Sequence, residues 1–189
     1  RISYLFIQEG GDGDSYDPII ASGANGALPH ATPSDKEIEK GDFIVMDFGS
    51  LYKGYHADMT RTIVVGEASE RHHEIYNIVL ESQLAGIAAA KSGIKCSELD
   101  HACREVIDAK GYGELFMHST GHGLGLEVHT MPRITWMNHS LLEENNVITI
   151  EPGIYIAGWG GVRIEDDCLI LKNQCRPMNS STKELVVVD

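Results

Sequence analysis

The chain contains the segment Asp47-Phe-Gly-Ser-Leu-Tyr-Lys-Gly-Tyr-His-Ala-Asp58, and a related segment, Glu151-Pro-Gly-Ile-Tyr-Ile-Ala-Gly-Trp-Gly-Gly-Val-Arg-Ile-Glu165, follows in its last third. In each segment an apolar run leads into an acid-x-Gly motif, a turn and a Gly-x-x-x-acid motif. This internal repeat predicts two antiparallel hairpins, each carrying two carboxylates. We expect a pseudo-twofold relation between the hairpins, with the acidic side chains converging between the two halves.

The elements on either side of the repeat indicate fold class α+β, because strands, then helices, then strands follow one another without regular alternation. Apolar runs predict extended segments at residues 4–7, 18–21, 42–48, 55–65, 147–151, 154–156, 162–171 and 184–188. One helix is expected from an N-cap at Ser69 to about Lys91, and a second from the capping sequence Ser97–Asp100 to Gly111. Because no linker-like stretch divides the chain, residues 1–189 are interpreted as one domain.

Composition and charge argue against several classes of protein. The chain has 189 residues, with 15 Lys and Arg against 28 Asp and Glu, and its formal charge is −13. Nucleic-acid binding requires clustered Lys and Arg, so no nucleic-acid partner is expected. No apolar run approaches the roughly 18 residues that suggest a membrane span, so no membrane partner is expected. The four cysteines have no CxxC spacing and are expected to be free thiols of a cytoplasmic protein.

The acids of the repeat are expected to face inward. Asp47 follows Ile44-Val-Met46, and Glu151 follows Val147-Ile-Thr-Ile150, so each acid ends an apolar strand. In a tight hairpin, Asp47 and Asp58 would lie roughly opposite each other on one face. Facing carboxylates repel, so this arrangement requires a compensating cation. A solvated hairpin face is the alternative interpretation.

A glycine-rich segment supplies histidines: His118-Ser-Thr-Gly-His-Gly-Leu-Gly-Leu-Glu-Val-His129. Ser119 breaks the HExxH pattern of a zinc-binding helix, and Gly121, Gly123 and Gly125 disfavour any helix. We therefore expect an irregular backbone that packs close to a bound group. Three histidines in so short a segment favour a site over isolated structural histidines.

The ordered residues Asp47, Asp58, His122, Glu151 and Glu165, within the motifs GYHADMTRT, GHGLGLEVH, EPGIY and GVRIED, resemble the pita-bread metallopeptidases. This family includes methionine aminopeptidases, prolidases (Xaa-Pro dipeptidases) and Xaa-Pro aminopeptidases. The similarity runs from about residue 18 to the C-terminus. It implies a pseudo-twofold antiparallel sheet with flanking helices, a peptide substrate and, in the full-length protein, a homodimer.

The resemblance implies that these five residues hold two divalent metal ions. Asp47 and Asp58 would bind one metal, with Asp58 bridging to the second, and His122 would bind the second alone. Glu151 and Glu165 would complete the coordination. Four carboxylates and one imidazole form a hard, oxygen-rich donor set, which favours Mn²⁺ and leaves Co²⁺, Fe²⁺ and Zn²⁺ as alternatives. Four carboxylates also balance the charge of two divalent cations.

The resemblance also implies catalytic roles. A hydroxide bridging the metals would attack the scissile carbonyl. Glu151 would take the proton of the water and help to pass it to the leaving nitrogen. His118 and His129 would polarise the carbonyl or stabilise the tetrahedral intermediate.

Two further residues are candidates for substrate binding. His30 matches a family histidine near the N-terminal side of the substrate, and Arg163 would orient Glu165 or another acidic group. A loop histidine is the alternative interpretation of His30, and a structural ion pair is that of Arg163.

The motifs beside the ligands favour the proline-specific branch. The segment Leu124-Gly-Leu-Glu-Val-His129 and the EPGIY and GVRIED motifs have the form seen in prolidases and Xaa-Pro aminopeptidases. We therefore expect hydrolysis of the Xaa-Pro bond, and substrate length stays open between a dipeptidase and an aminopeptidase. A methionine aminopeptidase or a broader aminopeptidase is the main alternative. An inert peptide-binding pseudo-peptidase and a metal-free creatinase-type hydrolase are disfavoured, because all five ligands are present.

The start of the chain differs from the family. Catalytic domains of this kind normally begin with helices before the first strand, and proline-specific members often carry a separate N-terminal domain. This chain starts at Arg1 in the middle of a pattern. We therefore expect residues 1–189 to be a catalytic domain truncated at its N-terminus.

Overall fold

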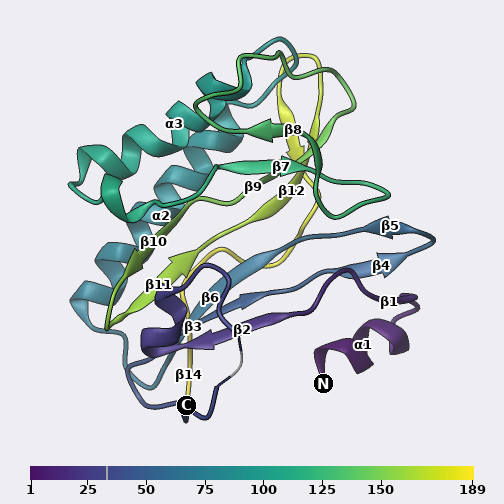
Figure 1. Ribbon diagram of the computed structural model, residues 1–189. Coiled ribbons are helices and arrows are strands. Elements are labelled where there is room, and N and C mark those ends of the chain that lie inside the picture. Colours follow the sequence, from purple (N-terminus) through teal and green to yellow (C-terminus); the bar gives the residue numbers. More distant parts are fainter. Residues whose placement is uncertain (33) are drawn as a thin grey trace.

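Two principal sheets form the core of the computed structural model, which describes residues 1–32 and 34–189. The first has the strand order β14-β6-β3-β2: β2 (Ile19–Ser22), β3 (Phe43–Asp47), β6 (Thr60–Val65) and β14 (Val186–Val188). The second has the order β13-β12-β9-β7-β8: β7 (Gly121–Gly123), β8 (Thr130–Ile134), β9 (Val147–Ile150), β12 (Asp166–Ile170) and β13 (Cys175–Pro177). Figure 1 shows the two sheets side by side, with α2 and α3 along the second.

The two sheets repeat one pattern. Strand β3 pairs antiparallel with β2 and β6, and β9 pairs antiparallel with β7 and β12. After each central strand comes a hairpin: β4 (Ser50–Tyr52) with β5 (Tyr55–His56), and β10 (Gly153–Ile156) with β11 (Gly160–Arg163). Strand β1 (Gly13–Asp14) is added beside β4. The α+β class and the pseudo-twofold arrangement expected from the repeat are therefore confirmed.

The two long helices follow β6 of the first sheet in the sequence and precede β7 of the second. Helix α2 (Glu70–Ala89) begins after Ser69, whose side chain accepts a hydrogen bond from the backbone N–H of His72, as expected for this N-cap. Helix α3 (Cys96–Ala109) begins two residues earlier than the expected capping sequence, because Lys95 is the N-cap in place of Ser97 and Glu98 accepts from the Lys95 backbone N–H. Gly111 follows α3 with φ +83°, a conformation typical of helix ends. Short 3₁₀ turns span Gly23–Ala27 (η1) and Gly113–Leu115 (η2).

The extended segment expected at residues 4–7 is wrong, because Ile2–Gln8 forms helix α1. The run ISYLFIQ is too short for its apolar spacing to distinguish a strand from a helix. Within the described part of the chain, Phe6 is the one residue of α1 with an aromatic contact, to Phe48 at a centroid distance of 6.1 Å. Gly10 adopts φ +95° and ends this helix.

The single strand expected at residues 162–171 is also wrong. Strand β11 pairs with β10, whereas β12 pairs with β9, so the chain changes partners at Ile164 and Glu165. This break lets Glu165 leave both ladders, and its backbone N–H donates to Thr60 O at 3.1 Å in the first sheet. Glu165 thus lies at the junction between the two halves of the fold, with its backbone N–H bonded to the first half.

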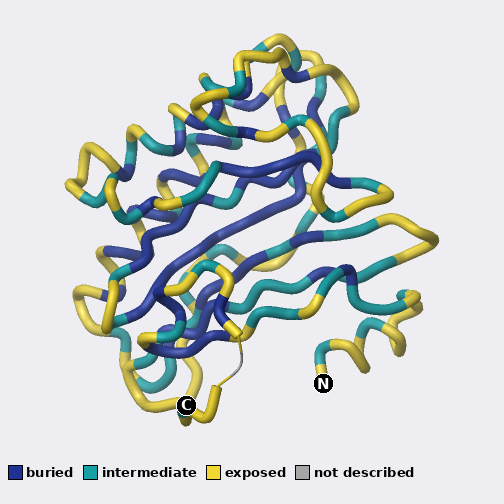
Figure 2. The backbone as a smooth tube through the Cα atoms, viewed as in Figure 1, coloured by how far each residue is buried: buried dark blue, intermediate teal, exposed yellow. Residues whose placement is uncertain are grey.

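The hydrophobic core lies between the second sheet and the helices. Figure 2 shows buried residues concentrated along the central strands and on the sides of α2 and α3 that face them. Gly86 of α2 lies where both helices meet β9, since an added Cβ would be 2.5 Å from Cys103 Sγ and 2.8 Å from Ile150 Cγ2. This close packing holds the end of β9, and with it Glu151, against a rigid support. The four cysteines are buried and free. No helix in the described part of the chain could span a bilayer.

Candidate active site

The acids of the repeat stand at the ends of the central strands. Asp47 is the last residue of β3, and Glu151 directly follows β9. The register pairs Asp47 with Thr60, so Asp58 lies two residues away from the position opposite Asp47 that the sequence suggested. Strand β6 begins at Thr60; between β5 and β6 the backbone still bonds to the partner strand at Ala57 and Met59, but Asp58 N–H donates to Asp167 Oδ2 at 3.0 Å. Asp58 is therefore displaced along the hairpin and points toward the second half.

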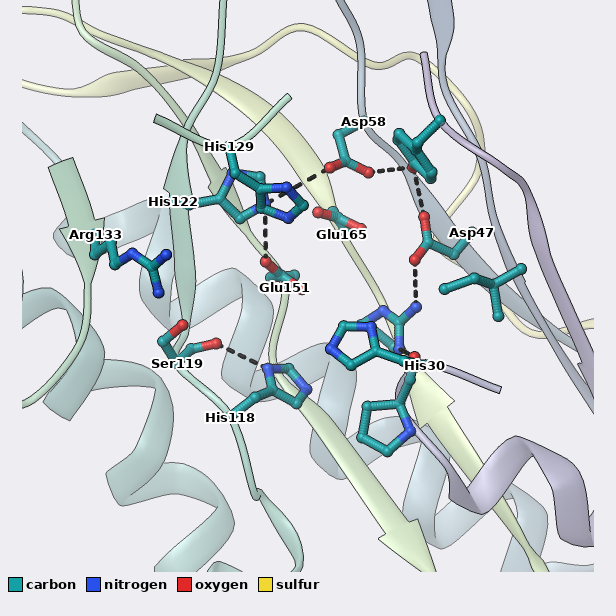
Figure 3. A pocket seen from close by; sticks show the side chains of 14 residues that line it. His30, Asp47, Asp58, His118, Ser119, His122, His129, Arg133, Glu151 and Glu165 are labelled. Atoms are coloured by element: carbon teal, nitrogen blue, oxygen red, sulfur yellow. Dashed lines mark hydrogen bonds and ion pairs between the residues drawn. The ribbon is translucent and has the colours of Figure 1, made fainter. Parts of the chain in front are cut away.

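Every candidate site residue lines one cavity of about 320 Å³. The lining residues are Tyr16, Ile19, Pro29, His30, Asp47, Asp58, His118, Ser119, His122, His129, Arg133, Glu151, Arg163 and Glu165. Figure 3 shows the acids of both halves facing one another across this cavity. Residues that lie far apart in the sequence thus converge, as the repeat indicated.

The donor atoms at the centre of the cavity fit a divalent cation. One donor atom each from Asp58, His122 and Glu165 lies within 4.8 Å of the others. His122 Nδ1 is 3.1 Å from Gly123 O, which can only accept, so this nitrogen carries the proton. The other nitrogen, Nε2, lies 3.6 Å from Asp58 Oδ2 and 3.4 Å from Glu151 Oε1. A lone pair that faces two ionised carboxylates is repulsive unless a proton or a metal ion lies between them, so this donor set fits a metal ion.

The carboxylates also repel one another in the absence of a cation. Burial, followed by repulsion from Asp47, raises the pKa of Asp58 to about 7. Burial raises the pKa of Glu151 to about 8, although the Arg163 guanidinium opposes this shift. Burial and neighbouring acids raise the pKa of Glu165 well above its ordinary value. Divalent cations would stabilise the ionised forms and so remove this cost.

Arg163 connects the two halves. Its Nη2 donates to Asp47 Oδ2 at 2.6 Å, and its Nε donates to Thr60 Oγ1 at 3.0 Å. The Thr60 hydroxyl in turn donates to Glu165 Oε2 at 2.6 Å. Arg163 therefore contacts the acid Asp47 directly and reaches Glu165 through a hydroxyl group.

His118 is held by both ring nitrogens. Its Nδ1 donates to Ser119 O at 2.8 Å, and its Nε2 lies 2.8 Å from the hydroxyl of Tyr155. Burial lowers the pKa of His118 to about 4, so the ring is neutral and Nε2 accepts from Tyr155. Arg163 Nη1 donates to the same hydroxyl oxygen at 2.8 Å. His118 is thus part of the cavity wall with both nitrogens already engaged.

His129 and His30 have more exposed rings than His118. The ring of His129 lies over that of His122 at a centroid distance of 4.2 Å. Partial burial lowers the pKa of His129, so its ring is neutral near pH 7. A neutral imidazole beside the donor set can donate one N–H to a carbonyl oxygen bound there. His30 lies beyond η1 on another side of the cavity (Figure 3).

The glycines of the histidine segment serve close strand packing. An added Cβ at Gly121 would be 2.0 Å from Thr149 O, and one at Gly123 would be 2.4 Å from Met131 O. Residues 121–123 form strand β7 between β8 and β9, so the irregular backbone expected here is limited, within these residues, to a register shift between His122 and Gly123. The glycines let neighbouring backbones approach, and this positions His122.

Sequence reasoning missed three polar lining residues. The Tyr16 hydroxyl hydrogen-bonds Asp47 Oδ1 at 2.5 Å and also Asp58 Oδ1. Arg133 pairs in register with His122 across β7 and β8, which brings its side chain to the cavity, and Ser119 also lines it. A predicted antiparallel strand after the GLEVH motif would have indicated that Arg133 lies beside His122. Nothing in the pattern around Tyr16 marked its hydroxyl.

Residues 1–172 match the model of metallopeptidase family M24, and the chain belongs to this family. It is 50% identical over 186 residues to the Xaa-Pro dipeptidase of Pyrococcus furiosus, a match that covers 98% of this chain and 53% of that protein. The chain spans about half the length of the curated relatives it matches.

Solved structures give the same result. The Xaa-Pro dipeptidase from Bacillus anthracis matches with TM-score 0.97 and 48% identity, covering 99% of this chain and 53% of that one. The X-Pro aminopeptidase from Thermotoga maritima matches with TM-score 0.96 and 46% identity, again covering 99% and 53%. The pita-bread fold and the resemblance to its Xaa-Pro-specific members are therefore confirmed.

Proposed function

We propose that this chain is the catalytic domain of a divalent-metal-dependent peptidase that hydrolyses the bond before proline in Xaa-Pro dipeptides. The observation that carries this proposal is the convergence of four buried or half-buried carboxylates and His122 on one cavity. Membership of a metallopeptidase family and 50% identity to a Xaa-Pro dipeptidase support it. Residues 1–189 are proposed as one catalytic unit, and the full-length protein is proposed to be a cytoplasmic homodimer. The four free thiols support the cytoplasmic location.

Two metal ions, with Mn²⁺ favoured over Co²⁺, Fe²⁺ and Zn²⁺, are proposed at the donor set Asp47, Asp58, His122, Glu151 and Glu165. When bound there, divalent cations would acidify a water molecule and polarise the scissile carbonyl. Glu151 would accept the proton of the attacking water and deliver it to the leaving nitrogen. Its position at the end of β9, within 3.4 Å of His122 Nε2, supports this role.

His129 would donate its N–H to the carbonyl oxygen as negative charge develops there. Its exposed ring over His122 supports this assignment. His118 would help to polarise the carbonyl or to stabilise the tetrahedral intermediate from the cavity wall, where its ring nitrogens contact Tyr155 and Ser119. His30 would contact the N-terminal side of the substrate.

Recognition of proline would depend on shape and on one charge. A prolyl nitrogen carries no hydrogen, so the site must contact the ring through apolar groups, and Ile19 and Pro29 line the cavity. Arg133 forms no ion pair within residues 1–32 and 34–189. A free guanidinium at the cavity suits the carboxylate of a C-terminal proline, which favours dipeptides.

An Xaa-Pro aminopeptidase is the second candidate, because the matched structures include one. The full-length protein with Mn²⁺ should hydrolyse Ala-Pro faster than Ala-Pro-Ala and Met-Ala-Ser. Arg133→Gln should raise the KM for Ala-Pro about tenfold or more and leave that for Ala-Pro-Ala nearly unchanged, whereas Arg176→Gln on the exposed face of β13 should change neither. Faster hydrolysis of Ala-Pro-Ala would favour the aminopeptidase, and faster hydrolysis of Met-Ala-Ser would favour a methionine aminopeptidase. Absence of stoichiometric divalent metal would favour an inert scaffold.

A further inference from the structure

Helix α3 carries an ion pair beside the cavity but outside it, between a buried carboxylate and a half-buried guanidinium. Asp100 is fully buried, and Arg104 Nε donates to its Oδ2 at 3.1 Å, one helical turn away. Arg104 Nη2 lies 3.3 Å from Asp100 Oδ1, so the guanidinium meets both carboxylate oxygens. A carboxylate buried in this way is costly unless its remaining acceptor sites, and the donors of its partner, are satisfied.

The remaining hydrogen bonds of the pair all go to the segment of residues 116–120. Asp100 Oδ1 accepts from Thr120 N at 3.1 Å and from Thr120 Oγ1 at 2.9 Å. Arg104 donates to Phe116 O and to His118 O, each at 2.9 Å. The guanidinium also lies over the Phe116 ring, 4.1 Å from its centroid. The side chains of Asp100 and Arg104 are called the α3 clamp below.

The segment that the α3 clamp hydrogen-bonds, residues 116–120, has no regular secondary structure. Residues 116–120 belong to no helix or strand, so their backbone groups depend on other partners. The segment carries His118, whose ring packs edge-on against Phe116 at a centroid distance of 5.2 Å. The α3 clamp therefore fixes the backbone from which the His118 ring reaches Tyr155.

We propose that Asp100 and Arg104 are positioning residues for the reaction at the cavity, acting through His118. This inference rests on the proposed function. Neither residue lines the cavity, and neither hydrogen-bonds a side chain of the proposed metal ligands. The α3 clamp thus holds the backbone that carries a wall histidine. Its link to the donor set passes through the backbone, where Thr120 O accepts from Glu151 N–H at 2.8 Å.

The first test uses Arg104→Lys, which keeps the charge but cannot hold two carbonyls and a carboxylate together. Its kcat for Ala-Pro with Mn²⁺ should fall about 10- to 100-fold, the scale for a catalytic group misplaced by about 1 Å. KM and the Mn²⁺ dissociation constant, measured by titration calorimetry, should change less than about threefold. Glu105→Gln is the matched control, because it removes the exposed His101–Glu105 pair of the same helix and should change nothing.

A merely structural role is separated by a double-mutant cycle. In a His118→Ala background, Arg104→Lys should cause no further loss of kcat, since the residue through which it acts is gone. Additive losses, or a parallel loss of Mn²⁺ affinity, would overturn the proposal. Asp100→Asn, which keeps one oxygen for Thr120, is a milder second variant that decides the question if Arg104→Lys does not fold.

A second measurement does not depend on activity. In the metal-free protein, ¹⁵N spectra of the His118 ring should show a protonated Nδ1 in the wild type and in Glu105→Gln. Arg104→Lys and Asp100→Asn should lose this single tautomer. An unchanged tautomer in both variants would overturn the clamp whatever the activity. If both variants lose the tautomer but the wild-type protein does not hydrolyse Ala-Pro, the proposed function is overturned and the α3 clamp is supported.

Discussion

Arg163 Nη2 lies 2.6 Å from Asp47 Oδ2, and this ion pair joins β11 of the second half to β3 of the first. Arg163 is almost fully buried, so its charge requires the acids around it. The same guanidinium donates to Thr60 and to Tyr155. One side chain therefore aligns the two halves at the point where their carboxylates converge.

Replacing this arginine should destabilise the fold. Arg163→Met leaves Asp47 without its cation, and removing one partner of a buried pair costs about 3–5 kcal/mol. Urea denaturation of the metal-free protein should show this loss in the free energy of unfolding. Glu98→Gln, which removes the exposed Lys95–Glu98 pair, should cost less than about 1 kcal/mol. Equal losses in the two variants would mean that the buried Arg163–Asp47 pair contributes no more to the free energy of unfolding than an exposed pair does.

The two histidines whose rings are in contact, His122 and His129, should respond differently to substitution. His122 Nε2 faces Asp58 and Glu151, so His122→Ala should lower the bound Mn²⁺ measured by elemental analysis. His129→Ala should keep the metal and reduce turnover of Ala-Pro by about two to three orders of magnitude, the scale for losing one donor to an oxyanion. Equal metal loss in both variants would contradict this division of roles.

The metal-free protein should lose stability as pH rises from about 6.5 to 8. In this range the carboxylates of the unfolded chain are ionised, whereas folding raises the pKa of Asp58 to about 7 and that of Glu151 to about 8. The folded state then binds more protons, and stability falls with pH. Below about pH 6.5 the depressed pKa values of His118 and His122, both about 4, act in the opposite direction.

The melting temperature in a chelator at pH 6.5 and pH 8 measures this effect. Excess Mn²⁺ should abolish the decrease, because a bound cation stabilises the ionised carboxylates. Glu151→Gln should flatten the pH dependence in the chelator, and the exposed Glu144→Gln should leave it unchanged. A melting temperature that rises toward pH 8 without metal would contradict the assigned pKa shifts.

The sequence predicts the hairpins and their acids because these depend on local patterns. Asp47 and Glu151 each end an apolar run, and the two runs became the central strands β3 and β9. The Ser69 N-cap is likewise a local signal. The glycine-rich segment indicated His118, His122 and His129, the resemblance added His30, and the structure brings all four to the same cavity.

The errors arise where long-range contacts decide the structure. The change of pairing at Glu165 depends on which strand lies alongside, and this is not encoded near the residue. The glycines of β7 are explained by the neighbouring backbones at Thr149 and Met131. Tyr16 reaches acids 31 and 42 residues away through one hydroxyl, and no periodic pattern marks such a contact.

That hydroxyl leads to a prediction about metal binding. The Tyr16 phenol hydrogen-bonds one oxygen of Asp47 and one of Asp58, and so orients both carboxylates toward the second half. Burial raises the pKa of the Tyr16 phenol far above its ordinary value, so the group stays protonated and can donate. Tyr16→Phe keeps the ring and removes only the hydroxyl.

We expect Tyr16→Phe to weaken Mn²⁺ binding about 10- to 100-fold, the usual cost of removing a group that orients metal ligands. Titration calorimetry of the chelator-treated protein measures the dissociation constant directly. Tyr55→Phe, at an exposed tyrosine of the β4–β5 hairpin, is the matched control and should bind Mn²⁺ as the wild type does. Unchanged affinity in Tyr16→Phe would mean that the two carboxylates are oriented by Arg163 and the strand ends alone.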